Sequence, residues 1–312
     1  MTSPEPIYTL ADLDTWSFPG TALAVLGHPI KHSISPPMHN AALAKMAERD
    51  SKFASWKYFR FDIAPDDLHV ALEKFHDCKR FTGLNLTVPH KIIACGLRNV
   101  AVTPDAAPIG AVNTLMRTEH GWNGFNTDGY GLSNGLRERF PDFKFDGSEV
   151  ILLGAGGAAR GAAIELGIQK CKRLWLVNRT AETRDQLLHM LEMTWGSNGP
   201  TVQILDLNNP PKDLATNPLV INATSAGLKP TDPLPIDLAA LAALARPKGV
   251  YDMIYNPPET PLLAQARALG IPAANGLSML VYQGVRALEI WSNATVPVDA
   301  MREAVAKAMA AR

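Results

Sequence analysis

Strand-like and helix-like segments alternate along nearly the whole chain, and this alternation limits the folds that the chain can adopt. Apolar runs typical of buried strands occur at residues 21–27, 56–61, 82–88, 111–117, 149–154, 173–178, 201–205, 218–222 and 248–253. Helical patterns occur at 35–48, 65–75, 128–140, 157–168, 181–193, 260–270 and over the tail from 276. Strands that are joined by helices form parallel sheets with helices on both faces. The sequence therefore predicts an α/β fold.

Length and charge narrow the class of protein further. A chain of 312 residues is longer than one hydrophobic core usually occupies, so we expect two domains. Lys and Arg together total 30, as do Asp and Glu, and this balance argues against nucleic acid or a membrane surface as a partner. We see neither a signal peptide nor an apolar run of roughly 18 residues, and we expect a cytoplasmic protein, either a monomer or a homodimer. The scattered cysteines and histidines predict no metal site.

A glycine-rich turn, LLGAGGAAR at 152–160, lies between an expected strand and an expected helix. Gly154, Gly156 and Ala159 fit the fingerprint of a Rossmann-type doubly wound domain. Glycines in this turn let the backbone approach a pyrophosphate, and the helix N-terminus favours its negative charge. We therefore expect Gly154, Ala155, Gly156, Gly157 and Ala158 to contact a dinucleotide. The alternative is a strand–turn–helix connection with a packing role only.

The end of the next strand indicates which dinucleotide binds. An acid at this position accepts hydrogen bonds from the ribose of NAD, whereas an arginine suits the 2′-phosphate of NADP. Here the strand ends in Asn178, Arg179 and Thr180, and Arg184 adds a positive group in the following helix. These residues favour NADP, unless Arg179 is only a solvated surface charge.

Several polar residues interrupt apolar segments in the first 130 positions. In NLTVPHK (85–91), Asn85 and Thr87 alternate with apolar residues, so they face the opposite side of the strand. Lys91 follows at the carboxyl end of this strand, where ligands bind in open α/β sheets. Taken one residue at a time, the structural interpretations are favoured at this point: Ser35 as a helix N-cap, Asp128 as an acid at a helix start, and Lys91 as a surface lysine.

In combination, these segments resemble the shikimate dehydrogenase family, in that family's order and over nearly the whole chain from about residue 21. The matching motifs are GHPIKHSISPPMHN (27–40), NLTVPHK (85–91), GAVNTL (110–115), FNTDGYG (125–131), LLGAGGAAR (152–160), NRT (178–180), INATSAGL (221–228), YDMIYNPPETPLL (251–263) and NGLSMLVYQG (275–284). The resemblance implies the reversible reduction of 3-dehydroshikimate to shikimate with NADPH, in aromatic amino-acid biosynthesis.

The resemblance also assigns roles to individual residues. Lys91 and Asp128 match the catalytic pair, and an ammonium beside the substrate carbonyl can transfer a proton and stabilise negative charge on its oxygen. Ser33 and Ser35 match the residues that hold the substrate carboxylate. The remaining substrate positions are Thr87, Asn113 and Gln283, which match residues that hold hydroxyl groups, and Tyr255, which matches a residue lining the pocket.

Further cofactor contacts and the domain organisation follow from the same resemblance. The implied cofactor residues outside the glycine-rich turn and the NRT segment are Asn222, Thr224, Met253, Gly276 and Met279. An N-terminal α/β substrate domain is expected over 1–127 and a Rossmann-type NADP-binding domain over 128–275. The C-terminal helices, 276–312, are expected to pack back on the substrate domain.

Two alternatives stay open from the sequence. The first is a quinate/shikimate dehydrogenase that uses NAD or NADP, because quinate differs from shikimate by a hydroxyl group close to the position that Ser33 and Ser35 would bind. Arg184 lies one residue later than the family's usual second basic position, and this shift bears on the preference for NADP. The second alternative is a non-catalytic NADP-binding regulator, which the presence of both Lys91 and Asp128 disfavours.

Overall fold

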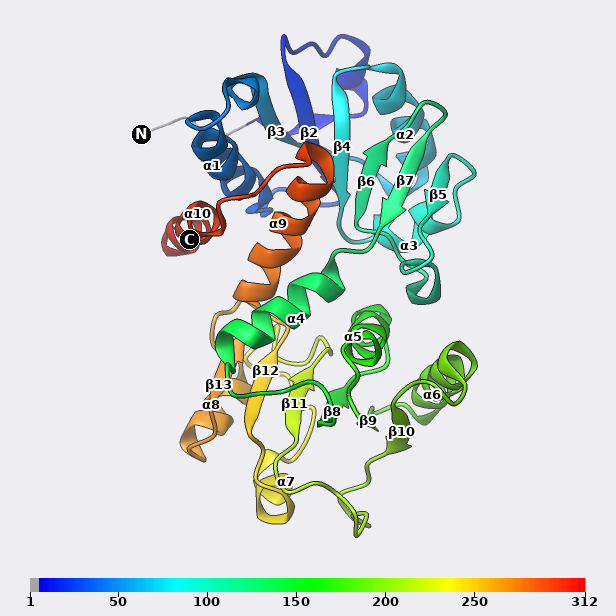
Figure 1. Ribbon diagram of the computed structural model, residues 1–312, viewed down its shortest axis with the longest axis vertical. Helices are drawn as coiled ribbons and strands as arrows, with labels where there is room; N and C mark the ends of the chain where they lie inside the picture. The colour runs from blue at the N-terminus through cyan, green and yellow to red at the C-terminus, as the bar shows by residue number, and fades with distance from the viewer. Residues whose placement is uncertain (1–5, 312) are drawn as a thin grey trace. The chain divides into compact units, whose positions relative to one another are not determined.

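A computed structural model describes residues 6–311, and it contains two compact units (Figure 1). Unit 1 comprises residues 1–127 and 281–312, and unit 2 comprises residues 128–280. Residues 1–5 and 312, at the outer ends of the predicted domains, lie outside the described residues. The second boundary falls inside a helix, α9 (Leu277–Ser292), a few residues beyond the predicted boundary at 275.

Unit 1 is built on a sheet with the strand order β1-β3-β2-β4-β6-β7-β5. Its strands are β1 (Tyr8–Thr9), β2 (Thr21–Gly27), β3 (Trp56–Asp62), β4 (Phe81–Leu86), β5 (Val100–Val102), β6 (Thr114–Arg117) and β7 (Trp122–Phe125). Its helices are α1 (Ser35–Ala47), α2 (Leu68–Asp77), α3 (His90–Cys95), the larger part of α9, and α10 (Val298–Ala310), with 3-10 turns at Ala11–Asp14, Ser51–Ser55, Pro65–Asp67 and Ala107–Ile109.

The sheet of unit 1 is mixed, whereas the sequence predicts parallel sheets. Strands β1 to β4 pair in parallel, but β6 runs antiparallel to both β4 and β7. A tight hairpin, in which the Thr118 amide donates to the Gly121 carbonyl, accounts for the antiparallel pairing of β6 with β7. Gly121 has a φ of +147°, a conformation that favours glycine.

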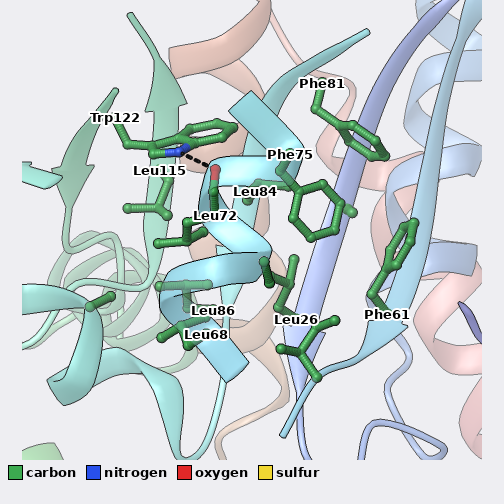
Figure 2. Packing of buried hydrophobic residues seen from close by; sticks show 14 of the residues in the cluster. Leu26, Phe61, Leu68, Leu72, Phe75, Phe81, Leu84, Leu86, Leu115 and Trp122 are labelled. Atoms are coloured by element: carbon green, nitrogen blue, oxygen red, sulfur yellow. Dashed lines mark hydrogen bonds between the residues drawn. The ribbon is translucent and has the colours of Figure 1, made fainter. Parts of the chain in front are cut away.

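The core of unit 1 fills the side of the sheet that α2 covers. Figure 2 shows Leu72 and Phe75 of α2 among side chains from the strands, with the Trp122 indole donating to the Leu72 carbonyl at 3.2 Å. Leu84 and Leu86 belong to this core, so the alternation in β4 places Asn85 on the other side of the sheet, as predicted.

The N-terminal segment, for which the sequence indicates no role, closes one end of this core. The Tyr8 ring stacks on Phe61 at 5.2 Å between ring centroids, and Trp16 packs against Phe81 at 4.6 Å. The described part of this segment therefore contributes to the hydrophobic core of unit 1.

Unit 2 contains a fully parallel sheet with the strand order β10-β9-β8-β11-β12-β13. The strands are β8 (Glu149–Leu153), β9 (Arg173–Val177), β10 (Thr201–Ile204), β11 (Leu219–Asn222), β12 (Gly249–Asp252) and β13 (Ala273–Asn275). The helices are α4 (Asp128–Arg139), α5 (Gly157–Ile168), α6 (Ala181–Trp195), α7 (Leu238–Leu244) and α8 (Pro261–Ala268). Counted from β8, this is the strand order of a doubly wound dinucleotide-binding domain, and β8 and β11 flank its switch point.

Candidate active site

Most predicted substrate residues of unit 1 come from segments at one edge of its sheet. Strands β2 and β4 run in parallel, with Leu26 opposite Leu86, so both end at this edge. The segment that contains Ser33 and Ser35 follows β2, and Thr87 follows β4. The antiparallel strand β6 begins at the same edge, because Thr114 lies opposite Asn85, and Asn113 directly precedes it. The mixed topology therefore brings a third segment to the edge that the parallel strands define.

Ser33 and Ser35 adopt a tight arrangement at the start of α1. The Ser35 amide donates to the Ser33 hydroxyl at 3.3 Å, and α1 begins at Ser35 itself. The prediction that Ser35 is the N-cap is wrong: Ile34 occupies that position, and no side chain caps the helix. The Ser35 hydroxyl is half-buried and is not used for capping.

Backbone hydrogen bonds fix Thr87 and Lys91 at the same edge. The Thr87 amide donates to the Leu26 carbonyl at 2.9 Å, and the Thr87 carbonyl accepts from His90 at 2.8 Å at the start of α3. Lys91 is half-buried in the first turn of α3. Its carbonyl accepts from the amide of Val112 at 2.9 Å, so the backbone of Lys91 lies beside the segment that leads to Asn113.

Asn113 is buried and firmly held. Its Oδ1 accepts from the Thr114 hydroxyl at 3.0 Å and from the Thr127 amide at 2.8 Å. Its carbonyl accepts from Nδ2 of Asn85 at 3.1 Å. The sequence places Asn85 correctly on the strand but gives it no role, because this contact joins segments that are far apart along the chain.

Gln283 lies on α9, next to a close approach between α9 and α1. A Cβ atom on Gly284 would come within 2.4 Å of Met38 Cε and 3.3 Å of His39 Cε1. Gln283 is half-buried, while its neighbours Val281 and Gly284 are buried. A larger residue at 284 would push the tip of the Met38 side chain aside, so glycine suits this close approach of α9 to the helix that begins at Ser35.

The other two residues of the predicted catalytic site belong to unit 2. Asp128 is the first residue of α4, and Tyr255 follows β12; both are half-buried. Lys91 belongs to unit 1, so the pairing of Lys91 with Asp128 stays a prediction.

The predicted cofactor segments of unit 2 converge on the carboxyl edge of its sheet. Leu153 is the register partner of both Val177 and Asn222, and Asp252 is the partner of both Asn222 and Asn275. The strands therefore end side by side, at the edge where ligands bind in open parallel sheets. Each predicted segment follows one of these strand ends: Asn178–Thr180, Gly154–Ala158, Thr224, Met253 and Gly276.

The glycine-rich turn has the geometry that a pyrophosphate requires. Gly154 has a φ of +110°, and a Cβ atom there would lie 3.0 Å from Thr224 Cγ2 across the switch point. Gly156 and Gly157 are exposed where α5 begins, and a Cβ atom on either would meet no atom within 4 Å. Open space in front of a helix N-terminus fits the binding of a phosphate anion.

The NRT segment offers one available positive charge. The Asn178 side chain stabilises the loop between β9 and α6, because its Nδ2 donates to the Thr180 carbonyl at 2.8 Å and to the Thr183 hydroxyl at 2.7 Å. Arg179 is exposed and forms no ion pair with any residue between 6 and 311. Arg184 instead pairs with Asp185 at 3.0 Å. Arg179 is therefore better suited than Arg184 to meet a 2′-phosphate.

Asn222 is fully buried, and both ends of its amide bond to protein atoms. Its Oδ1 accepts from the Thr224 amide and hydroxyl, and its Nδ2 donates to Asp252 at 3.0 Å. Asp252 was missed by the sequence reasoning; its carboxylate also accepts from the Thr260 hydroxyl at 2.6 Å, and burial raises the pKa of this carboxyl group. The Asn222 side chain thus shapes the turn that contains Thr224, and its predicted contact with the cofactor stays a prediction.

The last two cofactor segments pack tightly against one another. A Cβ atom on Gly276 would lie 2.2 Å from the Met253 carbonyl oxygen, so only glycine fits there. The Met279 amide donates to the hydroxyl of buried Tyr251 at 3.2 Å, which orients the first turn of α9. Both Met253 and Met279 stay half-buried at the sheet edge.

The strand order, the glycine-rich turn and Arg179 define a class of protein, the dinucleotide-binding α/β proteins. Comparisons identify the family. Residues 25–115 match the shikimate dehydrogenase substrate binding domain, and residues 276–306 match the shikimate 5′-dehydrogenase C-terminal domain. A curated shikimate dehydrogenase (NADP(+)) from Citrifermentans bemidjiense is 40% identical over 286 residues, which are 90% of this chain and 93% of the relative. This chain belongs to the shikimate dehydrogenase family.

Solved structures agree with this membership. Shikimate 5-dehydrogenase from Thermus thermophilus, in complex with NADP(H) and shikimate, superposes with a TM-score of 0.75 at 31% identity, covering 92% of this chain and 99% of that one. Shikimate 5-dehydrogenase from Listeria monocytogenes, in complex with shikimate and NAD, gives a TM-score of 0.76 at 26% identity, covering 91% of this chain and 96% of that one. Within residues 6–311, no helix combines the length and apolar character needed to span a bilayer.

Proposed function

We propose that this chain catalyses the reversible, NADP-dependent reduction of 3-dehydroshikimate to shikimate. The observation that carries the proposal is the convergence, at one edge of the unit 1 sheet, of hydroxyl and amide groups beside the lysine-bearing helix α3. A polyhydroxylated ring carboxylate needs several short donors of this kind around it. Family membership and the curated relative's activity support the same reaction.

Lys91 and Asp128 are the proposed catalytic pair. The Lys91 ammonium donates a proton to the substrate oxygen during reduction and accepts one during oxidation, and it stabilises negative charge that develops there. The Asp128 carboxylate, at the start of α4, is the second group proposed to take part in this proton transfer. Ser33 and Ser35 bind the substrate carboxylate, while Thr87, Asn113 and Gln283 bind its hydroxyl groups and Tyr255 lines the pocket.

The NADP cofactor supplies the hydride when it is bound. The backbone of 154–158 binds the pyrophosphate, and Arg179 with Thr180 binds the 2′-phosphate. Thr224 borders the adenosine side, and Met253, Gly276 and Met279 border the nicotinamide. These roles assign residues 128–275 to the NADP-binding domain, and residues 1–127 with the C-terminal helices to the substrate domain.

All three cysteines are free thiols, which suits a reducing cytoplasm.

Removal of the Lys91 ammonium tests the catalytic role. We expect Lys91→Met to lower kcat for shikimate oxidation by about a hundredfold or more. Binding of NADP⁺, measured by calorimetry, should stay unchanged because its proposed contacts lie in unit 2. The matched control is Lys79→Met, which removes an exposed lysine of the same unit. Full turnover by Lys91→Met would exclude this mechanism and favour the non-catalytic alternative.

Quinate oxidation is the second candidate activity. The Ser33–Ser35 pair at the start of α1 leans toward shikimate, but its two hydroxyls lie close to the carbon at which quinate carries an added hydroxyl group, so some activity on both acids is expected. The bound NAD of the Listeria structure makes NAD the second candidate cofactor. The ratio of kcat/KM for quinate to that for shikimate, measured with each cofactor, separates these activities.

A further inference from the structure

A chain of buried polar side chains runs behind the proposed substrate residues of unit 1. It links Tyr58 on β3, Asn85 on β4 and Thr114 at the start of β6, with relative exposures of 0%, 6% and 0%. The Tyr58 hydroxyl lies 2.7 Å from Oδ1 of Asn85, reaching across the intervening strand β2. The Nδ2 atom of Asn85 lies 3.0 Å from the Thr114 hydroxyl and 3.1 Å from the Asn113 carbonyl. The proposed reaction gives no role to Tyr58, Asn85 or Thr114.

The directions of the hydrogen bonds around Asn85 are fixed. The Asn113 carbonyl can only accept, so Asn85 turns its Nδ2 toward it and its Oδ1 toward Tyr58. Tyr58 must therefore donate to Asn85. The Thr114 hydroxyl accepts from Asn85, so its own proton is left for Oδ1 of Asn113 at 3.0 Å or for the Thr127 hydroxyl at 3.2 Å. Since the Thr127 amide donates to Oδ1 of Asn113, Nδ2 is the end of the Asn113 amide that a ligand would meet. The facing ligand atom is then an acceptor oxygen.

Hydrogen bonds and ring stacking from the helix that begins at Ser35 hold Tyr58 in place. The Asn40 side chain accepts from the Tyr58 amide at 2.8 Å and donates to the Tyr58 carbonyl at 3.0 Å. The His39 ring stacks on the phenol ring at 4.1 Å, with 11° between the planes. Burial raises the pKa of Tyr58, and a hydrogen bond with the Ser35 side chain partly offsets this rise. The start of α1 and the end of β4 thus meet at a single immobilised hydroxyl group.

We propose that Tyr58 is a positioning residue, which fixes Ser35 and, through Asn85, Asn113 in the orientations that bind the substrate ring. This proposal rests on the proposed function, because the role of Tyr58 is expressed through residues assigned to the substrate. The Tyr58 hydroxyl touches no reacting atom. Its effect is on substrate affinity, with smaller effects on the chemical step and on the cofactor.

The test is Tyr58→Phe, which removes the hydroxyl and leaves the ring to stack on His39. One buried hydrogen bond contributes about 1 kcal/mol, so we expect KM and the calorimetric Kd for shikimate to rise about fivefold or more. We expect kcat and KM for NADP⁺ to change less than about twofold. The matched control is Thr103→Val, which removes a hydroxyl that donates to the Gly124 carbonyl in the same unit, outside the polar chain. A purely structural role would lower the melting temperature of both variants and leave shikimate affinity unchanged.

A second variant tests the chain beyond Tyr58. Thr114→Val removes the hydroxyl that links Asn85 to Asn113, and it should raise KM for shikimate to a similar extent. Because both hydroxyls act through one chain, we expect the double variant to be less impaired than the product of the single effects. Tyr58→Phe with unchanged shikimate affinity, in a parent that binds shikimate, would overturn the positioning role alone. A parent that neither binds nor oxidises shikimate would overturn the proposed function and the positioning role with it.

Discussion

Because His39 is buried, we expect the free energy of unfolding of unit 1 to depend on pH, by an amount that follows from the shift in the His39 pKa. The ring is fully buried, and its Nδ1 lies 3.0 Å from the Ser35 carbonyl. Burial lowers its pKa from 6.5 to about 4, and the hydrogen bond to the Ser35 carbonyl offsets this only in part. The folded protein therefore keeps His39 neutral at pH values where the unfolded chain takes up a proton. Stability is fully present above the unfolded pKa and is lost as the pH falls from about 6.5 toward 4.

The magnitude is about 3 kcal/mol, because each tenfold change in proton affinity corresponds to about 1.4 kcal/mol. Denaturant unfolding at a series of pH values, followed by tryptophan fluorescence, measures this loss. The same titration on His39→Gln isolates the contribution of His39 from that of His90, whose pKa burial also lowers. His120→Gln, at an exposed position, is the matched control. If His39→Gln loses as much stability as the parent between about pH 7 and about pH 4, the burial argument is refuted.

The remaining predictions concern the cofactor edge of unit 2. Arg179→Gln should raise KM for NADP⁺ about tenfold and leave KM for NAD⁺ nearly unchanged, because only NADP carries the 2′-phosphate; an equal effect on both would mean that Arg179 does not read that phosphate. Arg184→Gln should have a smaller effect on KM for NADP⁺, because Arg184 is paired with Asp185. Gly276→Ala places a Cβ atom 2.2 Å from the Met253 carbonyl oxygen and should destabilise unit 2 by about 1–3 kcal/mol, measured as a lower melting temperature. The control is Gly147→Ala, where a Cβ atom would meet no atom within 4 Å but φ is +73°, so this variant shows the effect of backbone strain without a clash.

Local patterns in the sequence predict the cofactor edge well. The strand, the glycine-rich turn and the helix are neighbours along the chain, so periodicity and composition specify the turn at Gly154. The same holds for the alternation that puts Asn85 and Leu86 on opposite faces of β4. A strand period depends only on adjacent residues, and no distant contact is needed to interpret it.

Features that depend on distant contacts could not be predicted. The antiparallel strand β6 depends on a hairpin whose pairing with β4 joins Asn85 to Thr114. The polar chain from Tyr58 to Asn113 spans four neighbouring strands, β3, β2, β4 and β6, and no local signal marks Tyr58. Ser35 fits an N-cap by residue type, yet the turn formed with Ser33 moves the helix start by one position.

The most direct test of the proposed reaction is a grid of initial rates, with shikimate or quinate as the acid and NADP⁺ or NAD⁺ as the cofactor, followed by the absorbance of the reduced nicotinamide. We predict that shikimate with NADP⁺ gives the highest kcat/KM, and that Arg179→Gln removes most of the preference for NADP⁺. Equal or higher values with quinate or with NAD⁺ would contradict the assignment of an NADP-dependent shikimate dehydrogenase activity.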